Sequence, residues 1–541
     1  MWSVKFKEHL ARGGEPRFAV DFQSPDLLKT DTLTDQRYVL HSHTGPAATG
    51  HWSHAIETIS GTGQRVTIRS WKSSMGGLRV NLSSVKLAQS VAMNIPRGMM
   101  AELKVGFEGF SYEEFQTVGF YAYRGLSGSR NNWTMDFIDG ISLLQAKPSV
   151  HLSSQFYKQA GANKAKVLAG YSASSSSATS SLLVGPDDLS VPVTTENFPK
   201  DSKSGARGLL YCEPTDPGTE PFYLKFTQLT SSTFTVVNTN VLDTVRYDLD
   251  ANDLVTVIGY VQDSIPDVAQ ALLFGSRVGT TDFSGAVTMP DSWHCNLDPK
   301  SHLVDGPDMN RIRSIFLDEY ANFEGELIVS APMENPFRGI EEFLSAFGWW
   351  LVMHEGSLSY RFVQRTVPAG GHEYNFCAEF TITDSDIVSE DGYQLYSQDA
   401  PDEAFQVNFP NGHMSEDVKT LPGTFRLNHA SRSYVFNDDV LSSNKLNSNT
   451  NMRGRLLPWY TRIPDQLTLT LKSWKFAELV PGDVVSLDSR YLYNMVDGAR
   501  GYVGGTIFRD HSGTQYLVTG VDINWNRFSV TVQLSIPPST P

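Results

Sequence analysis

Short stretches in which apolar and polar residues alternate dominate the first part of the chain. Arg65–Arg69 and Leu78–Leu82 both follow this two-residue period, with glycine and turn residues between such stretches. A period of two places every second side chain on one face of a strand, so these segments predict strands with one buried face. We therefore predict a β-barrel or sandwich domain over residues 17–150, preceded by an N-terminal arm at residues 1–16.

One helix is expected inside this β domain. Ser111 is followed three residues later by Glu114, which is the pattern of a capping box, in which each residue satisfies a backbone N–H of the other. The pattern predicts a helix from Tyr112 to Val118.

The pattern changes between residues 151 and 260. Residues 170–181 are rich in serine, which is typical of a loop or linker. Strand patterns return in Phe222–Phe226 and Thr233–Val237. We interpret residues 151–260 as a linker and a small β insertion domain.

Helical spacing follows over residues 261–377. Apolar residues recur three or four positions apart in three segments, and their members are Val268, Ala271 and Leu272, then Ile312, Ile315, Phe316, Tyr320 and Phe323, then Ile340, Phe343, Leu344 and Phe347. Residues 348–363 predict a hairpin that turns at Glu355-Gly356. These features predict a mixed α/β domain.

The last part of the chain, residues 378–541, again predicts strands. Leu467, Leu469 and Leu471 alternate with polar residues, as do Val530, Val532, Leu534 and Ile536. We therefore expect a second barrel and a multidomain fold that is mainly β, with a smaller α/β part. No internal repeat is visible in the sequence.

Charge and cysteine content reduce the number of protein classes to which the chain could belong. The chain of 541 residues carries 44 basic and 59 acidic residues, a formal charge of −15, which opposes binding to a phosphate backbone. Its three cysteines, Cys212, Cys295 and Cys377, are widely spaced and do not predict a disulfide framework. The N-terminal residues do not resemble an export signal, and the longest apolar stretch, Leu344–Met353, is too short to span a membrane.

The sequence contains no local signature of a hydrolase, nucleotide-binding loop or zinc protease. We therefore predict no catalytic residue, no cofactor and no metal ion. The best metal candidate is a group of closely spaced residues, which we interpret as solvated loop residues because glycine, proline and serine surround them. Its members are His41, His43, His51, His54 and Glu57.

Two other patterns have simple interpretations. His294-Cys295 could suggest an activated thiolate, but adjacent side chains diverge on an extended backbone, so we expect Cys295 to be packed. The pairs Glu113-Glu114 and Glu341-Glu342 cannot place both carboxylates on one substrate, and we expect them to be solvated.

One charge pattern suggests a role. Residues 366–418 contain eleven acidic residues and no lysine or arginine. This stretch is either a solvated acidic face or a surface that does not retain passing DNA. The candidate residues for such an acidic lumen lining are Asp384, Asp386, Glu390 and Asp391.

The order of these segments resembles that of the tail tip or baseplate hub proteins of bacteriophages and gene transfer agents. The stretches that resemble this family lie at residues 105–144, 208–236, 265–279, 340–362, 380–393, 479–489 and 515–534. The resemblance implies two tail-tube-like β-barrel domains with inserted domains between them, and a homotrimeric ring in the virion, made in the host cytoplasm. The implied partners are the distal tail protein, the tail tube, the tape measure protein and a central tip or fibre protein, with DNA passing through the ring.

Two other classes stay open at this stage. A cell-wall or polysaccharide-degrading enzyme could use Trp349, Trp350 and Trp459 as sugar platforms, although buried core aromatics explain these residues better. A carbohydrate-binding adhesin without catalysis is the third possibility.

Overall fold

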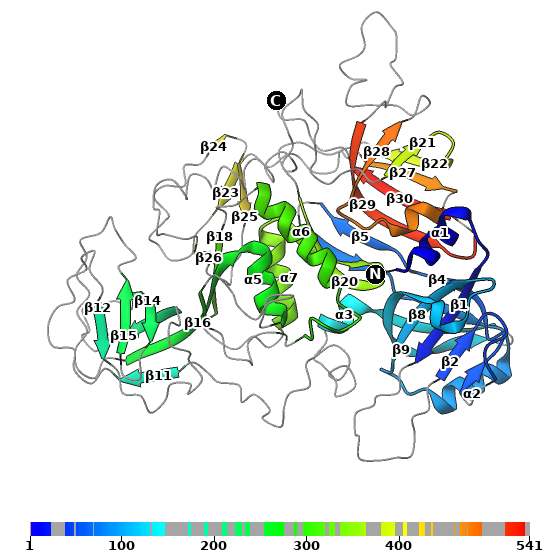
Figure 1. The fold of residues 1–541 in the computed structure, drawn as a ribbon, viewed down its shortest axis with the longest axis horizontal. Helices are drawn as coiled ribbons and strands as arrows, with labels where there is room; N and C mark the ends of the chain where they lie inside the picture. The colour runs from blue at the N-terminus through cyan, green and yellow to red at the C-terminus, as the bar shows by residue number, and fades with distance from the viewer. Residues whose placement is uncertain are drawn as a thin grey trace, which may run out of the picture.

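The chain is mainly β and has several domains, as predicted (Figure 1). The computed structural model describes residues 2–22, 38–47, 50–68, 70–129, 132–145, 171–174, 189–192, 208–213, 222–229, 233–237, 254–274, 286–288, 295, 297–319, 324–329, 336–363, 380–394, 404–407, 421–422, 424–427, 434–435, 459, 466–472, 474–488, 514–527 and 529–535. No helix in these ranges is long and apolar enough to cross a membrane.

The N-terminal sheet has eight strands in the order β3-β2-β1-β8-β9-β10-β7-β4. Its strands are β1 Pro16–Phe22, β2 Tyr38–His41, β3 His51–Trp52, β4 Ile56–Ser60, β7 Arg79–Leu82, β8 Met100–Phe107, β9 Gln116–Ser129 and β10 Asn132–Asp139. The hairpin β5 Gln64–Thr67 and β6 Lys72–Met75 leaves this sheet, and α2 Val85–Asn94, η1 Tyr112–Glu114 and α3 Gly140–Gln145 connect or follow its strands.

The C-terminal sheet contains six strands in the order β21-β28-β29-β30-β27-β22. They are β21 Phe380–Thr383, β22 Ile387–Gln394, β27 Gln466–Leu471, β28 Val484–Asp488, β29 Thr514–Asn524 and β30 Ser529–Ser535, with the short helix η3 Trp474–Glu478 between β27 and β28. Burial alternates along β27, where Leu467, Leu469 and Leu471 are buried, as their spacing predicted.

The segments between these two sheets form the inserted parts. One sheet joins β12-β15-β14-β13-β16-β18-β26, with β11 and β17 also paired to β16. The bounds of its strands are β11 Tyr171–Ser174, β12 Leu189–Pro192, β13 Gly208–Glu213, β14 Phe222–Leu229, β15 Thr233–Val237, β16 Leu254–Ser264, β17 Ala286–Thr288, β18 Glu324–Val329 and β26 Tyr434–Val435. A smaller sheet contains β23 Ala404–Val407, β24 Leu421–Pro422 and β25 Thr424–Leu427.

The three predicted helices and the predicted hairpin are confirmed in the middle of the chain, although Phe347 follows the third helix, and Tyr320 and Phe323, assigned to the second, lie outside the described residues. The helices are α5 Ile265–Phe274, α6 Gly306–Glu319 and α7 Pro336–Ala346, and the hairpin strands are β19 Trp349–His354 and β20 Ser357–Phe362. Glu355 and Gly356 have φ values of 47° and 77°, as a tight two-residue hairpin turn requires. In Figure 1 these elements lie between the β11–β15 strands and the two outer sheets.

The N- and C-terminal sheets repeat one arrangement of six strands. In chain order β3, β4, β7, β8, β9 and β10 correspond to β21, β22, β27, β28, β29 and β30. In both sheets the third to sixth strands are consecutive neighbours, and the second strand is an edge. The relative strand directions also agree, since β21 is parallel to β28 and the β1–β2 hairpin that separates β3 from β8 leaves that pair parallel. A helical segment follows the third strand in each sheet, α2 in one and η3 in the other.

Irregular positions coincide in the two copies. The β4–β7 register shifts between Ile56 and Thr58, and the β22–β27 register shifts between Ile387 and Ser389. A second shift passes over one residue before Gly125 in β9 and one residue before Gly520 in β29. Since a bulge re-aims a strand at one particular position, the two matched bulges show that the copies share their backbone geometry at these positions. A further shift between Glu390 and Gly392 in β22 has no counterpart in β4.

Matched backbone hydrogen bonds extend the repeat to the turns. The N–H of Gly98 donates to Tyr123 at 2.7 Å, and the N–H of Gly482 donates to Val518 at 2.8 Å. Both glycines have positive φ, 83° and 112°, which glycine adopts without strain. Gly98 and Gly482 therefore occupy equivalent turns before β8 and β28.

Neither sheet is closed by a hydrogen-bonded ladder among the described strands, so the predicted closed barrels are not observed. Both sheets nevertheless curl strongly. The C-terminal edge strands β21 and β22 are joined by residues 384–386, which span at most about 15 Å, whereas the edges of a flat six-stranded sheet lie about 24 Å apart. Residues 53–55 join β3 and β4 in the same way.

The two sheets are joined to each other. In β5, Gln64 and Arg65 pair with Val521 and Gly520 of β29, so a hairpin from the N-terminal part extends the C-terminal sheet. One hydrophobic core contains buried residues from both sheets, including Leu103 and Val532. Figure 1 shows the two sheets side by side, coloured blue to cyan and orange to red.

The N-terminal arm contains a helix that was not predicted, α1 Val4–Arg12. Ser3 caps its first turn, and Gly13 ends it in the left-handed conformation. Lys7 forms ion pairs with Glu355 of the middle hairpin and with Glu478 of η3, the latter at 3.1 Å. The arm therefore contacts both the middle and the C-terminal parts.

Two local predictions need correction. The helix expected over 112–118 is only one turn, because β9 begins at Gln116 and pairs with β8. Its capping contact is present, since the Ser111 N–H donates to Glu114 at 2.8 Å. The serine-rich segment was predicted to be a loop, but Tyr171–Ser174 pairs with β16, so sheet pairing overrides local composition there.

Gly356→Ala is expected to lower the free energy of unfolding by about 2–4 kcal/mol. A Cβ at Gly356 would collide with the backbone of Thr117 and Val118 in β9, and the φ of 77° is unfavourable for alanine. Urea denaturation measures the effect.

The matched control is Gly109→Ala. Gly109 also has positive φ, 86°, but a Cβ there has no atom within 4 Å. We expect a loss of only about 1–2 kcal/mol. Equal losses would show that the hairpin does not pack closely on β9.

Candidate functional site

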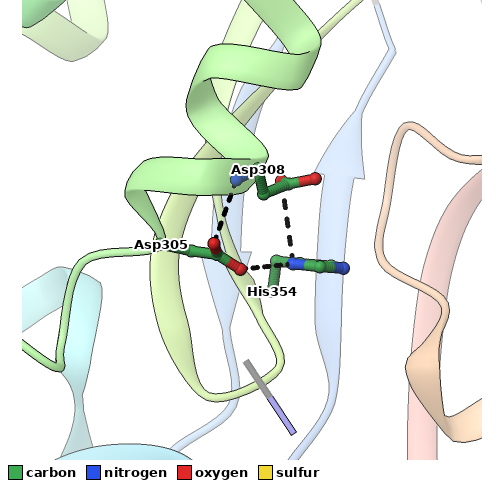
Figure 2. Close-up of side chains that lie close together, drawn as sticks. All are labelled: Asp305, Asp308 and His354. Atoms are coloured by element: carbon green, nitrogen blue, oxygen red, sulfur yellow. Dashed lines mark hydrogen bonds and ion pairs between the residues drawn. The ribbon is translucent and has the colours of Figure 1, made fainter. Parts of the chain in front are cut away.

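Asp305, Asp308 and His354 form the one group of metal-ligand residue types that converges in the described part of the chain (Figure 2). Asp305 directly precedes α6, Asp308 lies in the first turn of that helix, and His354 ends β19. Both carboxylates are buried. The group lies where α6 meets the β19–β20 hairpin.

The geometry of the group follows from a helix start. Asp305 accepts the backbone N–H of Asp308 at 3.0 Å, as a capping residue does. Its second oxygen lies 2.8 Å from Nδ1 of His354. The same nitrogen lies 3.7 Å from the Asp308 carboxylate.

Cationic and hydroxyl donors already occupy the Asp308 carboxylate. Arg361, which is 1% exposed, donates from Nη1 at 2.5 Å, and Ser359 donates from its hydroxyl at 2.7 Å. Arg311 donates to the other oxygen at 2.7 Å. Arg361 also donates to Asp483, which follows the Gly482 turn, at 2.9 Å. We call Asp305, Asp308, His354, Arg361 and Asp483 the charge network.

The electrostatics of the charge network favour ion pairing. Burial acts to raise the pKa of Asp308, but the charges of Arg361 and His354 outweigh it and hold that pKa well below its usual range. Burial lowers the pKa of Arg361, whereas Asp483 and Asp308 raise it, and the net shift is upward. A metal ion would have to displace Arg361 from Asp308, so the donor set fits a buried ion-pair network better than a metal centre.

A second buried carboxylate also connects separate parts of the chain. Glu102 of β8 is 1% exposed and accepts hydrogen bonds from Thr117 and His302, each at 2.8 Å. His302 belongs to the segment before α6. Burial acts to raise the pKa of Glu102, and His302, Lys104 and Thr117 lower it overall.

The histidine group predicted to be solvated is only partly so. His41 is completely buried in β2, where it pairs with Ala19, so the solvated-loop interpretation is wrong for this residue. Its Nε2 lies 3.0 Å from Nδ1 of His51, whereas His43 stacks on Phe115 and His54 contacts Thr44. The side chain of Glu57 is exposed. The ring of His41 thus contacts both His43 and His51, with centroids 5.2 and 5.3 Å apart.

Other candidate residues lie in the core. Cys295 is buried, as predicted, and burial raises the pKa of its thiol. Trp349, Trp350 and Trp459 are 0%, 2% and 1% exposed. Because these indoles are buried, they are not accessible to a sugar, which agrees with their interpretation as core aromatics.

The four residues proposed for an acidic lining have different surroundings. Asp384 is half-buried in the β21–β22 turn. Asp386, in the same turn, is buried, accepts hydrogen bonds from Thr383 and pairs with Lys475 at 3.0 Å. Glu390 and Asp391 lie in the edge strand β22, and their side chains are outside the described set. Asp386 therefore has a local structural partner.

Sequence reasoning missed the charge network. Asp308, Arg361 and Asp483 are 53 and 122 residues apart, and no local motif connects them. The strand around Arg361 gave no signal either, because Arg361 shares the polar positions of an alternating pattern with Ser357 and Ser359, a pattern that predicts a solvent-facing side chain.

Comparisons with known proteins give little further information. No protein-family model and no curated protein matches the chain. Among solved structures, it is similar to a chain of "Virion of native gene transfer agent (GTA) particle", with a TM-score of 0.21 and 10% sequence identity, over 47% of this chain and 83% of that chain. A match with this TM-score carries no argument about function.

Proposed function

We propose that the chain is a structural subunit of a phage-like virion, a hub that forms a closed ring of three copies at the tail tip. In this role it joins the tail tube and distal tail protein to a central tip or fibre protein, next to the tape measure protein. The observation that carries the proposal is the six-strand repeat. Each chain contributes two equivalent units, so three chains present six units to a sixfold tube.

Two further features support the proposal. The order of segments resembles that of phage hub proteins over most of the sequence. The two units share one core, and the β5–β6 hairpin from the N-terminal part pairs with β29 of the C-terminal sheet, so they form a fixed pair rather than two loosely linked domains.

Particle composition tests the proposal. In purified tails, quantitative mass spectrometry should find three copies of this chain for every six tube subunits of one ring. Light scattering of the assembled ring should give about three times the 60.0 kDa chain mass. One copy per tail, or absence from particles, would contradict the proposal.

We also propose that part of the acidic stretch faces the DNA channel of the ring. Changing Asp384, Glu390 and Asp391 to lysine should leave the ring mass unchanged and reduce DNA delivery, because DNA would adhere to the lining. Added salt should weaken the defect, since 0.1 M salt screens charges over about 10 Å.

Asp386→Lys is the control for this experiment. Asp386 pairs with Lys475 and holds the β21–β22 turn, so its reversal should lower stability and assembly. If the triple variant delivers DNA normally, the acidic stretch does not line the channel.

A further inference from the structure

One strand edge has different surroundings in the two copies of the repeat, namely the side of β9 that faces β8 and the equivalent side of β29 that faces β28. In the C-terminal sheet, β28 pairs with β29 only up to Leu517, and β5 then occupies the same side of β29 at Gly520 and Val521. In the N-terminal sheet, β8 pairs with β9 only up to Ala122. Gly125 and Leu126 of β9 occupy the positions that Gly520 and Val521 occupy in β29, because the registers and bulges of the two strands match.

No described strand occupies that side of β9 from Gly125 to Ser129, which we call the free edge. In the C-terminal sheet, a Cβ at Gly520 would lie 3.2 Å from the Arg65 side chain of the added hairpin. At Gly125 the nearest atom is Nε of Arg97, at 3.5 Å. Unpaired backbone groups on an exposed edge favour the addition of another strand.

A groove of about 690 Å³ borders the free edge. Gly125 and Leu126 line it together with Arg79, Arg97, Arg124 and Asp136. Arg79 lies 3.5 Å from Asp136. Arg97 and Arg124 are exposed, and neither has an ion-pair partner among the described residues. Within the part of the chain that the structure describes, the groove therefore presents two positive charges without an ion-pair partner, beside a strand edge without a neighbouring strand.

The repeat also indicates what fills the groove. The hairpin β5–β6 leaves the N-terminal sheet between its second and third repeat strands, β4 and β7. The equivalent connection in the C-terminal sheet runs between β22 and β27, residues 395–465, and its described strands β23–β26 pair within the same chain. Its first part, residues 395–418, carries five acidic residues and no lysine or arginine. This charge complements Arg97 and Arg124.

We propose that the free edge and its groove bind, by strand addition, the part of residues 395–465 of a second copy of this chain that lies outside β23–β26. Within one chain, β5 extends the C-terminal sheet; between chains, the equivalent connection extends the N-terminal sheet of the next copy. Such a head-to-tail contact generates a ring when its rotation closes. The choice of a second copy as the occupant rests on the ring proposed above.

Cross-linking in the assembled full-length chain tests the contact directly. With p-benzoylphenylalanine at position 129, next to the groove, irradiation should yield intermolecular cross-links to residues 395–465. The matched control is position 93 on α2, where Met93 is 85% exposed and should give none. Cross-links from position 129 only to other parts of the chain, or to none, overturn the proposal.

Charge reversal provides a second, independent measurement. Arg97→Glu with Arg124→Glu should weaken self-association at least tenfold, which is about 1.4 kcal/mol, and leave the unfolding midpoint unchanged. Lys86→Glu on α2, compared with Arg97→Glu alone, is the charge-matched control. Adding Asp402→Arg and Glu403→Arg to the reversed chain should restore association.

The outcomes separate this inference from the proposed function. A ring that forms normally with both arginines reversed overturns the groove contact and leaves the hub intact. A confirmed groove contact in a chain that is absent from tail particles overturns the hub and leaves the contact intact. A chain that stays monomeric at about 100 µM, an affinity weaker than about −5.5 kcal/mol, overturns both.

Discussion

Arg361→Ala is expected to lower the free energy of unfolding by about 3–5 kcal/mol, because it removes the fully buried cation that pairs with the buried carboxylate of Asp308 and with Asp483. Arg361 is the residue of the charge network that contacts both Asp308 and Asp483. Asp308 belongs to the middle part of the chain, and Asp483 follows the Gly482 turn of the C-terminal part. Urea denaturation followed by tryptophan fluorescence measures the loss.

The matched control is Arg311→Ala, which removes another arginine from the same Asp308. The side chain of Arg311 is 46% exposed, and solvent screening reduces such a pair to at most about 1 kcal/mol. Similar losses in the two variants would contradict the argument, because they would show that burial does not decide the strength of these pairs.

Acid should weaken the same network. The pKa of Asp308 is lower in the folded chain than its ordinary value of about 4 in the unfolded chain. Its stabilising contribution is therefore complete above about pH 4 and is lost as the pH falls through the folded pKa. Between pH 4 and pH 2.5, Asp308→Asn should show a smaller fall in unfolding midpoint than the unchanged protein. Equal falls would exclude Asp308 as a source of acid sensitivity.

Local periodicity predicted the elements that depend on local sequence. The hairpin at Glu355-Gly356, the helix containing Phe343 and Leu344, and the alternation at Leu467–Leu471 were correct. In each case the residues that determine the element lie within a few positions of each other in the sequence. Helix α1 had such signals in Ser3 and Gly13, and these were overlooked.

The repeat could not be recognised by the same means. Gly98 and Gly482 match, as do Gly125 and Gly520, but Ile59 corresponds to Glu390 and Arg79 to Thr468. Two glycines and a few apolar positions suffice to preserve bulges and turns, while the exposed positions differ. Strand order and register depend on contacts between residues as far apart in sequence as Pro16 and Phe107 or Phe380 and Val485, which one sequence does not display.

The candidate site was missed for a related reason. A buried ion pair needs partners whose separation in sequence is arbitrary, such as Arg361 and Asp483. For the acidic stretch the difficulty was different. Its high density of acidic residues suggested one shared role, although the individual residues have different surroundings. Asp386 has a structural partner in Lys475, which net charge alone could not indicate.

Trp350→Ala is expected to cost about 3–5 kcal/mol and to uncouple the parts of the chain that meet at this indole. Trp350 stacks on Trp71, the residue that turns the β5–β6 hairpin, with ring centroids 5.6 Å apart. Its Nε1 donates to the carbonyl of Pro481 at 3.0 Å, in the C-terminal part. Trp71 has a φ of 49°, an unfavourable conformation that this packing helps to maintain.

The neighbouring Trp349 provides a control of equal size. Its ring packs against Phe362, Phe316 and Tyr360, all within the middle part of the chain. Trp349→Ala should also cost about 3–5 kcal/mol. This loss should destabilise only the middle part of the chain, because these ring contacts of Trp349 all lie within that part. Calorimetry should therefore show separate transitions for the middle and outer parts in Trp350→Ala, with faster proteolysis between them. One shared transition in both variants would show that Trp350 does not couple these parts, and that the β5–β29 pairing and the charge network suffice to hold them together.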